Sequence, residues 1–227
     1  MSDITFSIIL PAYKQENQIA ILYETYLSAL NTLNDSWELI FVINGQKDNS
    51  QKILEGLSKN NPNVKIHILE KGGWGRAVKY GISVAEGKFV CYTNSARTNI
   101  EDLVLMLKYA KVNDNVIIKA TRIIRESFFR KFGSVLYNFE NRFLFKTPIW
   151  DVNGTPKIIP RKILDAFEIV SDDDLIDAEI IAKCFKRKFM VVEIPVVSTK
   201  RISGKSTTNI GSALKMYWGL FRIKKMM

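Results

Sequence analysis

Short apolar runs alternate with segments of helical periodicity through the first 120 residues of the chain. The apolar runs cover residues 6–10, 37–43, 64–69, 87–93 and 115–120. The first two are followed by Pro11 and by Asn44-Gly45, the kind of punctuation that ends buried strands. Between the runs, apolar side chains recur at helical spacing over residues 18–33, 50–57, 75–85 and 100–112. This alternation predicts an α/β fold with a mostly parallel sheet and helices on both faces.

The pattern is less regular in the second half of the chain. Helical spacing predicts helices over residues 126–145, 161–169, 175–185 and 211–225. A further strand is expected over 190–197, where Glu193 and Pro195 are typical of a sheet edge. Because no linker or internal repeat divides the sequence, we expect one domain over residues 1–227.

Composition narrows the kind of protein and the kind of partner. Hydrophobic residues make up 47% of the chain, enough for a sizeable core, and the net charge of +10 favours anionic partners. The only histidine, His67, lies in a strand-like segment and is interpreted as structural, and Cys91 and Cys184 lack the spacing of zinc ligands. No leader sequence and no apolar run of membrane-spanning length is visible. These features predict a cytoplasmic protein or one lying on the cytoplasmic face of a membrane.

The candidate binding residues fall in loops that follow predicted strands. In parallel sheets with helices on both faces, ligands bind beyond the carboxyl ends of the strands. The loops at 11–16, 44–48, 72–75 and 93–97 all lie at that edge of the predicted sheet. We therefore expect them to line one pocket.

Short motifs along the chain resemble, in order and spacing, those of family-2 glycosyltransferases. They are P-A-Y-K-Q-E-N at 11–17, V-I-N-G-Q-K-D at 42–48, G-W-G-R-A-V-K-Y-G at 73–81, D-V-N-G-T-P-K at 151–157, D-A-E at 177–179, and E-I-P-V at 193–196, followed by Arg201 and G-K-S at 204–206. Each motif alone is weak evidence, but their collinearity from about residue 7 to 206 is specific. The resemblance is to polyprenyl-phosphate sugar synthases of the dolichol-phosphate mannose synthase type.

This resemblance implies a GT-A fold and an inverting transfer of a sugar from a UDP- or GDP-sugar to an acceptor, expected to be polyprenyl phosphate. It divides the chain into a nucleotide-sugar-binding half (1–120), an acceptor half (121–210) and a C-terminal amphipathic helix (211–227). The donor-binding residues that it implies are Pro11, Ala12, Tyr13, Gln15, Asn44, Gly75, Asn94 and Ser95.

The chain departs from the family where a metal would bind. Thr93, Ser95 and Arg97 occupy the positions of the acidic motif that holds Mg²⁺ or Mn²⁺ against the diphosphate. Hydroxyls are poor ligands for these cations and a guanidinium cannot coordinate them, so no metal ligands are predicted. Three interpretations stay open: Arg97 replaces the metal, the protein is an inactive module that binds a nucleotide sugar or scaffolds a glycan-assembly complex, or Arg97 is a solvated loop charge.

Two further acids of the donor side are replaced by amides, at Gln15 and Asn44. The Asn44 amide oxygen is expected to accept a hydrogen bond from the N–H of uracil or guanine. The glycines of the 72–75 loop are expected to let the backbone approach a ligand. Trp74 either covers the nucleotide or plugs the loop.

The acceptor side is expected to bind phosphate. Arg122, Arg130, Lys205 and Ser206 are the predicted phosphate or acceptor contacts, and Arg201 joins Arg97 as a residue that neutralises charge in the reaction. Because a lipid phosphate is already anionic, it needs no strong general base. A sugar hydroxyl acceptor would need one, and the candidates are Asp151 and Glu179, each with the alternative of a structural role in capping or ion pairing.

Two basic, aromatic segments, 128–145 and 214–225, raise the question of a membrane surface. Amphipathic helices of this composition lie in anionic interfaces, but the same aromatics also suit an ordinary core with a cationic rim. No nucleic-acid-binding motif accompanies them, so nucleic acid is not an expected partner.

Overall fold

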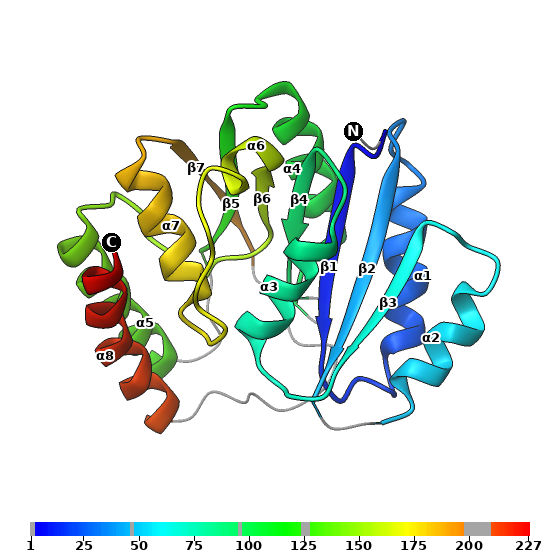
Figure 1. Ribbon diagram of the computed structural model, residues 1–227, viewed down its shortest axis with the longest axis horizontal. Helices are drawn as coiled ribbons and strands as arrows, with labels where there is room; N and C mark the ends of the chain where they lie inside the picture. The colour runs from blue at the N-terminus through cyan, green and yellow to red at the C-terminus, as the bar shows by residue number, and fades with distance from the viewer. Residues whose placement is uncertain (1–2, 46–47, 95–96, 124–127, 198–209) are drawn as a thin grey trace.

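The computed structural model describes residues 3–45, 48–94, 97–123, 128–197 and 210–227 (Figure 1). Within these ranges, it describes only the backbone of residues 128–132 and 210–215. Seven strands form one sheet: β1 (Phe6–Ala12), β2 (Trp37–Asn44), β3 (Val64–Leu69), β4 (Phe89–Tyr92), β5 (Val116–Arg122), β6 (Lys157–Pro160) and β7 (Met190–Val196). Their spatial order is β3-β2-β1-β4-β6-β5-β7. Every pairing is parallel except those of β6, which runs antiparallel to β4 and β5. The predicted mostly parallel α/β sheet is confirmed.

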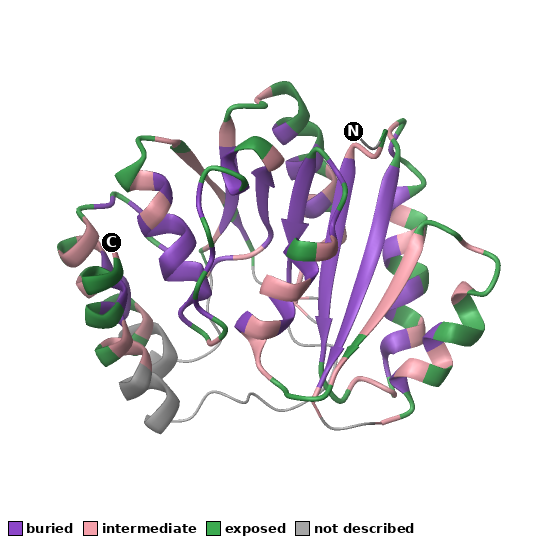
Figure 2. Cartoon of the chain, in the orientation of Figure 1, coloured by how far each residue is buried: buried purple, intermediate pink, exposed green. Residues whose placement is uncertain are grey.

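The helices of the described residues are α1 (Ile19–Leu30), α2 (Ser50–Ser58), α3 (Trp74–Val84), α4 (Ile100–Val112), α5 (Phe128–Phe145), α6 (Arg161–Leu164), α7 (Ile176–Lys186) and α8 (Ile210–Met226). The central strands are buried along their length (Figure 2). Their successive side chains point to opposite faces, so each strand contributes to two cores. On β1, for example, Ile8 packs with α1 and α4, whereas Ile9 packs with α3 and α7. Helices therefore cover both faces, as predicted.

A third apolar cluster joins α5, α7 and α8 beside the sheet. Tyr137 of α5 lies edge-on to Tyr217 of α8, with 5.8 Å between ring centroids, and Leu220 and Ile223 of α8 are buried against α7. The C-terminal helix is thus packed onto the domain. Within the described part of the chain, no helix is both long enough and apolar enough to cross a bilayer.

Two elements of the second half differ from the prediction. Strand β6 was not predicted, because it has four residues and begins with the buried Lys157, which breaks an apolar pattern. The helix expected over 161–169 is only α6, and the chain after Leu164 runs on as a loop to α7. The edge position expected for Glu193 and Pro195 is confirmed, since β7 is the last strand of the sheet.

Candidate active site at the carboxyl edge of the sheet

The loops after β1, β2 and β3 are held together by the side chain of Asn44. Its amide Nδ2 donates to the carbonyl oxygen of Ala12 at 3.0 Å, and its Oδ1 accepts from the backbone N–H of Gly73 at 3.0 Å. Because Asn44 is buried, these two bonds fix the ends of β1 and β2 against the glycine-rich turn at 72–75. The hydrogen bond predicted between Asn44 and a nucleobase would have to use Oδ1, which already accepts from the backbone N–H of Gly73.

Glycine is required where these loops meet. Gly45 has φ of +85°, and a Cβ there would lie 3.0 Å from both Gly72 Cα and a ring carbon of Tyr13. The Tyr13 ring thus rests on the junction of two loops, and the residue is 41% exposed at the sheet edge. An aromatic ring in this place is suited to stack on a nucleobase.

The structure gives the other predicted donor residues local roles. Pro11 and Ala12 end β1, and the Gln15 carbonyl accepts from Gln18 and Ile19, which begins α1. Gly75 is buried, and a Cβ there would lie 1.9 Å from the carbonyl oxygen of Asp173. The missing side chain of Gly75 makes room for this protein backbone, and the predicted contact between Gly75 and the donor stays a prediction.

The loop after β4 holds the residues that replace the acidic motif. Thr93 is buried, and its hydroxyl is hydrogen-bonded to that of Thr98, whose Oγ1 also lies 2.8 Å from the Asn94 carbonyl. Arg97 is partly buried and its backbone N–H donates to the same carbonyl at 3.0 Å. Ser95 lies outside the described residues. The Thr93 hydroxyl already has a protein partner and a guanidinium cannot coordinate a cation, so Thr93 and Arg97 do not fit a divalent metal ion.

An ion-paired cluster occupies the same edge at the ends of β5 and β7. Arg122 binds Asp151 through two bonds, Nε–Oδ2 at 2.7 Å and Nη2–Oδ1 at 2.8 Å, and its backbone N–H donates to Asp151 as well. Asp151 is buried, so the pair fixes the guanidinium in one orientation. Burial opposes ionisation of Arg122, but the hydrogen-bonded carboxylate of Asp151 raises its pKa above the ordinary value.

Glu193 supports this pair from β7. Its carboxylate accepts from the backbone N–H groups of Trp150 at 2.9 Å and Asp151 at 3.2 Å, which fixes the loop that carries Asp151. The fully buried Lys119 binds the same carboxylate at 2.9 Å. Burial, together with the neighbouring Lys157, lowers the pKa of Lys119 to about 8, against the attraction of Glu193.

Asp177 connects the cluster to the donor side. It accepts hydrogen bonds from Tyr92 at 2.9 Å and from the indole Nε1 of Trp74 at 3.2 Å, and it pairs with Lys157. Burial lowers the pKa of Lys157, although Asp177 opposes the shift. Trp74 is therefore tied into the protein framework, which supports the interpretation that it fills the loop.

The two candidate general bases both have structural partners. Asp151 is engaged by Arg122, as described. Glu179 is fully buried and accepts from the backbone N–H groups of Val170 at 2.8 Å and Ser171 at 2.6 Å, and pairs with Lys183 at 2.5 Å. Burial would raise the pKa of Glu179, but these bonds lower it below the ordinary value, which weakens it as a base. These contacts favour a structural role for both Asp151 and Glu179 over a role as general base.

A pocket of about 160 Å³ opens beside the Arg122–Asp151 pair. Its lining combines polar residues, among them Thr121, Ser134 and Asn138, with the apolar Val135 and Trp150. Asn138 is fixed by Val152, whose N–H donates to its Oδ1 at 3.0 Å. The pocket is thus lined by Arg122 together with both polar and apolar side chains. The phosphate contacts predicted at Lys205 and Ser206, and Arg201, lie outside the described residues, as does the side chain of Arg130.

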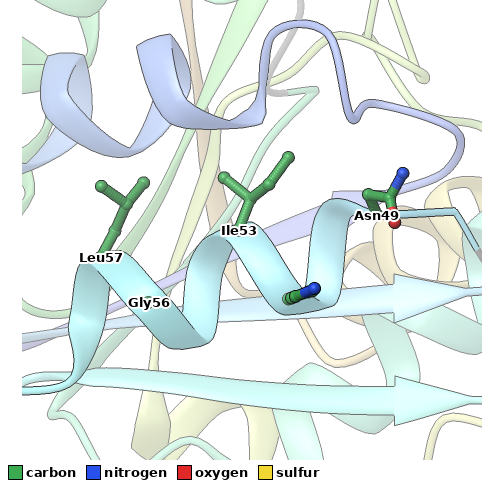
Figure 3. Close-up of a pocket in the computed structure, with 5 residues that line it drawn as sticks. Asn49, Ile53, Gly56 and Leu57 are labelled. Carbon is green, nitrogen blue, oxygen red and sulfur yellow. The ribbon is translucent and has the colours of Figure 1, made fainter.

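A larger open groove of about 600 Å³ runs along α2 (Figure 3). Ile53 and Leu57 project from the same side of that helix. Apart from Asn49, which precedes α2, its lining residues lie on the helix and not on the loops after the strands. We assign no function to it.

Sequence reasoning missed the buried cations of the cluster. Lys119 interrupts the apolar run Val116-Ile117-Ile118-Lys119-Ala120, and a cation in a buried strand needs an anionic partner. Lys157 ends the D-V-N-G-T-P-K motif at 151–157, but the motif implied no role for this lysine. The sequence could have flagged both lysines, but only the register, which pairs Lys119 with Lys157 across β5 and β6, shows that they are neighbours.

The mostly parallel sheet with helices on both faces is the fold of GT-A glycosyltransferases. The chain belongs to glycosyl transferase family 2, whose sequence profile matches residues 7–167. A crystal structure of Mycobacterium tuberculosis glucosyl-3-phosphoglycerate synthase, in complex with Mn²⁺, UDP and phosphoglyceric acid, superposes with a TM-score of 0.75 at 13% identity, covering 97% of this chain and 78% of that one. At that identity the likeness shows the fold alone.

Longer relatives match nearly the whole chain. The undecaprenyl-phosphate 4-deoxy-4-formamido-L-arabinose transferase of Proteus mirabilis is 25% identical over 217 residues, covering 94% of this chain and 66% of its own length. The uncharacterized glycosyltransferase YkcC of Bacillus subtilis is 23% identical over 219 residues, with the same coverage. The chain thus spans just under two thirds of the length of these relatives.

Proposed function

We propose that the protein transfers a glycosyl group from a nucleoside-diphosphate sugar to a polyprenyl phosphate. The observation that carries the proposal is the position of Arg122, oriented by Asp151 in a pocket lined by both polar and apolar side chains. Such a pocket suits a phosphate monoester attached to a hydrocarbon chain. The names of the matched relatives, which include an undecaprenyl-phosphate transferase, favour catalysis over a binding-only module.

The chemistry is a single displacement at the anomeric carbon. An oxygen of the acceptor phosphate forms a bond to the anomeric carbon as the bond to the donor diphosphate breaks, and the nucleoside diphosphate leaves. The acceptor oxygen is already deprotonated, so no general base is needed, in keeping with the engaged carboxylates of Asp151 and Glu179.

Charge must still be neutralised at both ends of the displacement. Arg122 carries five N–H donors, of which Asp151 engages two, so it can bind the acceptor phosphate without breaking the pair. On the leaving side, Arg97 follows β4 at the metal-ligand position of the family, and we propose that it stabilises the departing diphosphate in place of a cation. Lys205, Ser206, Arg130 and Arg201 are proposed to add positive charge or hydrogen bonds around the phosphates.

The donor half is proposed to bind UDP or GDP at the loops joined by Asn44. The exposed ring of Tyr13 would stack on the base, with Gln15 and Asn94 beside it on the same edge. Asn44 would act mainly by holding the loops, because its amide already has two backbone partners.

A transfer assay tests the proposal directly. The chain is mixed with UDP- and GDP-sugars and undecaprenyl phosphate in detergent, with EDTA or with added Mg²⁺ or Mn²⁺. We expect turnover that survives EDTA and falls about 100-fold in Arg97→Ala. Arg122→Lys, which loses the two-point geometry, should raise KM for the lipid phosphate without changing KM for the donor.

The outcomes separate the parts of the proposal. Turnover abolished by EDTA would exclude the role of Arg97 as a replacement for the metal. Binding of nucleotide sugars without turnover would leave the binding-only module as the function. Neither binding nor turnover with any donor would exclude both.

We also propose that α5 and α8 rest on an anionic membrane surface, on the cytoplasmic face. Phe139 and Phe143 of α5 are 66% and 76% exposed, and Trp218 of α8 is 76% exposed. Arg142, Lys146, Lys224 and Lys225 accompany them on the same two packed elements and the turn that follows α5. Aromatics interleaved with cations suit the interface of an anionic bilayer.

Vesicle binding tests this surface. The wild-type chain should sediment with phosphatidylglycerol-containing vesicles and be released by salt, and Phe143→Glu should weaken binding about tenfold. Leu105→Glu is the matched control, because Leu105 is 63% exposed on α4, which packs on the other face of the sheet. Equal binding by both variants and the wild type would exclude the α5–α8 surface.

A further inference from the structure

The segment 170–177, which leads into α7, lies between the glycine-rich turn at 72–76 and the C-terminal helix α8. In Figure 1 it is the yellow loop beside the start of α3. Its contacts to both neighbours are close, and they combine backbone and buried side chains with two exposed ion pairs, Arg76–Asp172 and Arg222–Asp173. Through these contacts, segment 170–177 connects the turn at 72–76 to α8, two parts of the molecule that are far apart in sequence.

Toward the turn, the segment makes three kinds of contact. The Asp173 carbonyl oxygen lies where only glycine fits at position 75, at 1.9 Å from an ideal Cβ. Asp172 pairs with Arg76 at 3.0 Å, and Asp177 accepts from the Trp74 indole at 3.2 Å. Gly73 in the same turn has φ of +142°, a conformation that strains residues with a side chain. The glycine-rich turn is therefore held in one backbone conformation, and its contacts with segment 170–177 fix its position.

Toward α8, the contacts are equally specific. A Cβ on Gly219 would lie 2.1 Å from a methyl carbon of Leu175, which is itself buried with Leu220 and Ile223. One turn along the helix, Arg222 pairs with Asp173 at 2.6 Å. Asp173 thus touches both neighbours, with its carbonyl against Gly75 and its carboxylate on Arg222.

We infer that α8 positions the donor-binding turn through segment 170–177, with Arg222 and Gly219 as positioning residues. Close-packed protein transmits displacement, and the contacts here are made by a backbone carbonyl, that of Asp173, and by the buried Leu175 side chain. A shift of α8 therefore moves the turn that Asn44 joins to the rest of the donor loops. The inference rests on the proposed function, since it takes this turn as part of the donor site.

A pair of glycine variants tests the connection. Gly219→Ala adds a methyl group against Leu175, whereas Gly56→Ala in α2 adds one where an ideal Cβ meets nothing within 4 Å. Affinity for UDP, GDP and UDP-sugars is measured by calorimetry on the full chain. We expect Gly219→Ala to weaken binding about three- to tenfold, and Gly56→Ala to bind like wild type.

A second pair avoids any effect on packing. Arg222→Glu and Lys225→Glu carry the same charge change on exposed faces of α8, but only Arg222 has an ion pair with Asp173. We expect Arg222→Glu to raise the donor Kd and donor KM by about twofold or more with kcat unchanged, and Arg222→Lys to restore both. A role limited to stability would lower the unfolding temperature and leave the donor Kd unchanged.

The failures are distinguishable. If wild type binds nucleotide but Gly219→Ala and Arg222→Glu both bind with wild-type affinity, the connection is excluded and the proposed function stands. The same follows if Lys225→Glu weakens binding as much as Arg222→Glu. If wild type binds no nucleoside diphosphate or nucleotide sugar, the proposed function falls and the inference falls with it.

Discussion

The donor and acceptor sides share one edge of the sheet but are built from different interactions. On the donor side, glycines and hydrogen bonds hold the loops after β1, β2 and β3: Asn44 bonds Ala12 and Gly73, and the carboxylates of Glu16 and Asp48 accept from backbone N–H groups. On the acceptor side, three buried or half-buried cations pair with three carboxylates, in the pairs Lys119–Glu193, Arg122–Asp151 and Lys157–Asp177. The donor loops are therefore held by glycine positions and hydrogen bonds to the backbone, and the acceptor side by buried ion pairs.

This difference should appear in how each side responds to substitution. A neutral hydrogen bond contributes about 1 kcal/mol net, and its loss costs more only when a buried partner is left unsatisfied. Removing one member of a buried ion pair leaves an uncompensated charge, at about 3–5 kcal/mol. The acceptor side is therefore expected to be the more fragile in stability.

The largest effect is expected at Asp177. Asp177→Asn keeps the shape but only one acceptor oxygen, so either Trp74 or Tyr92 loses its acceptor, and it leaves the fully buried Lys157 without its counter-charge. The free energy of unfolding, measured by urea denaturation, should fall by about 3–5 kcal/mol.

The double variant Lys157→Met, Asp177→Asn is the control for this prediction. It removes the uncompensated charge at nearly constant volume, so stability should return to within about 2 kcal/mol of wild type. If the double variant is as unstable as the single one, shape and not charge governs this side, and the comparison fails.

An intermediate effect is expected at Asn44. Asn44→Asp restores the residue usual in the family but puts a carboxylate oxygen 3.0 Å from the Ala12 carbonyl, where the amide donates in this chain. Loss of the bond and repulsion between acceptors should cost about 2–3 kcal/mol at pH 7, more than Asn44→Ala.

The pH dependence of that loss identifies its cause. The carboxyl group of the variant should have a raised folded-state pKa, since its protonated form can donate to Ala12. The folded state then binds more protons than the unfolded state, so the deficit should shrink as pH falls from 7 toward 4. A deficit that is constant with pH would point to packing instead.

The smallest effect, when counted per pH unit, concerns the titration of Lys119. Its folded-state pKa of about 8 lies below the unfolded value of 10.5, so between these values the unfolded state binds more protons. The stability of wild type relative to Lys119→Met should therefore rise with pH between about 8 and 10.5, by at most about 1.4 kcal/mol per pH unit. Parallel stability curves for the two proteins would show that the buried amine does not titrate there.

Much of this architecture was predictable, and the reason lies in the strands. Runs such as Ile8–Leu10 and Leu39–Ile43 are buried on both faces, so their sequences are continuously apolar and easily found. Strand β6 fails that test because Lys157 faces Asp177 from a helix 20 residues away in sequence. A buried strand that contains a charged residue cannot be recognised from its apolar pattern, because the residue that neutralises the charge lies elsewhere in the sequence.

The candidate site was also predictable only in part, because the sequence indicates which residues matter but not which residues they contact. Arg122 and Asp151 were both selected by motif position, but their pairing joins residues 29 apart in sequence. The glycine at 75 was recognised as necessary, whereas the Asp173 carbonyl that requires it came only from the packing of the loop before α7. Motifs marked the positions, and the tertiary structure supplied the partners.

The pairing of the buried charges has a consequence for how the protein meets its partners. Three cations and three anions cancel inside the cluster, so the net charge of +10 is carried entirely outside it. That excess creates a long-range field that speeds the approach of anionic surfaces and ligands before any contact forms. Association should therefore slow as salt shortens the reach of the field, to about 8 Å at physiological ionic strength.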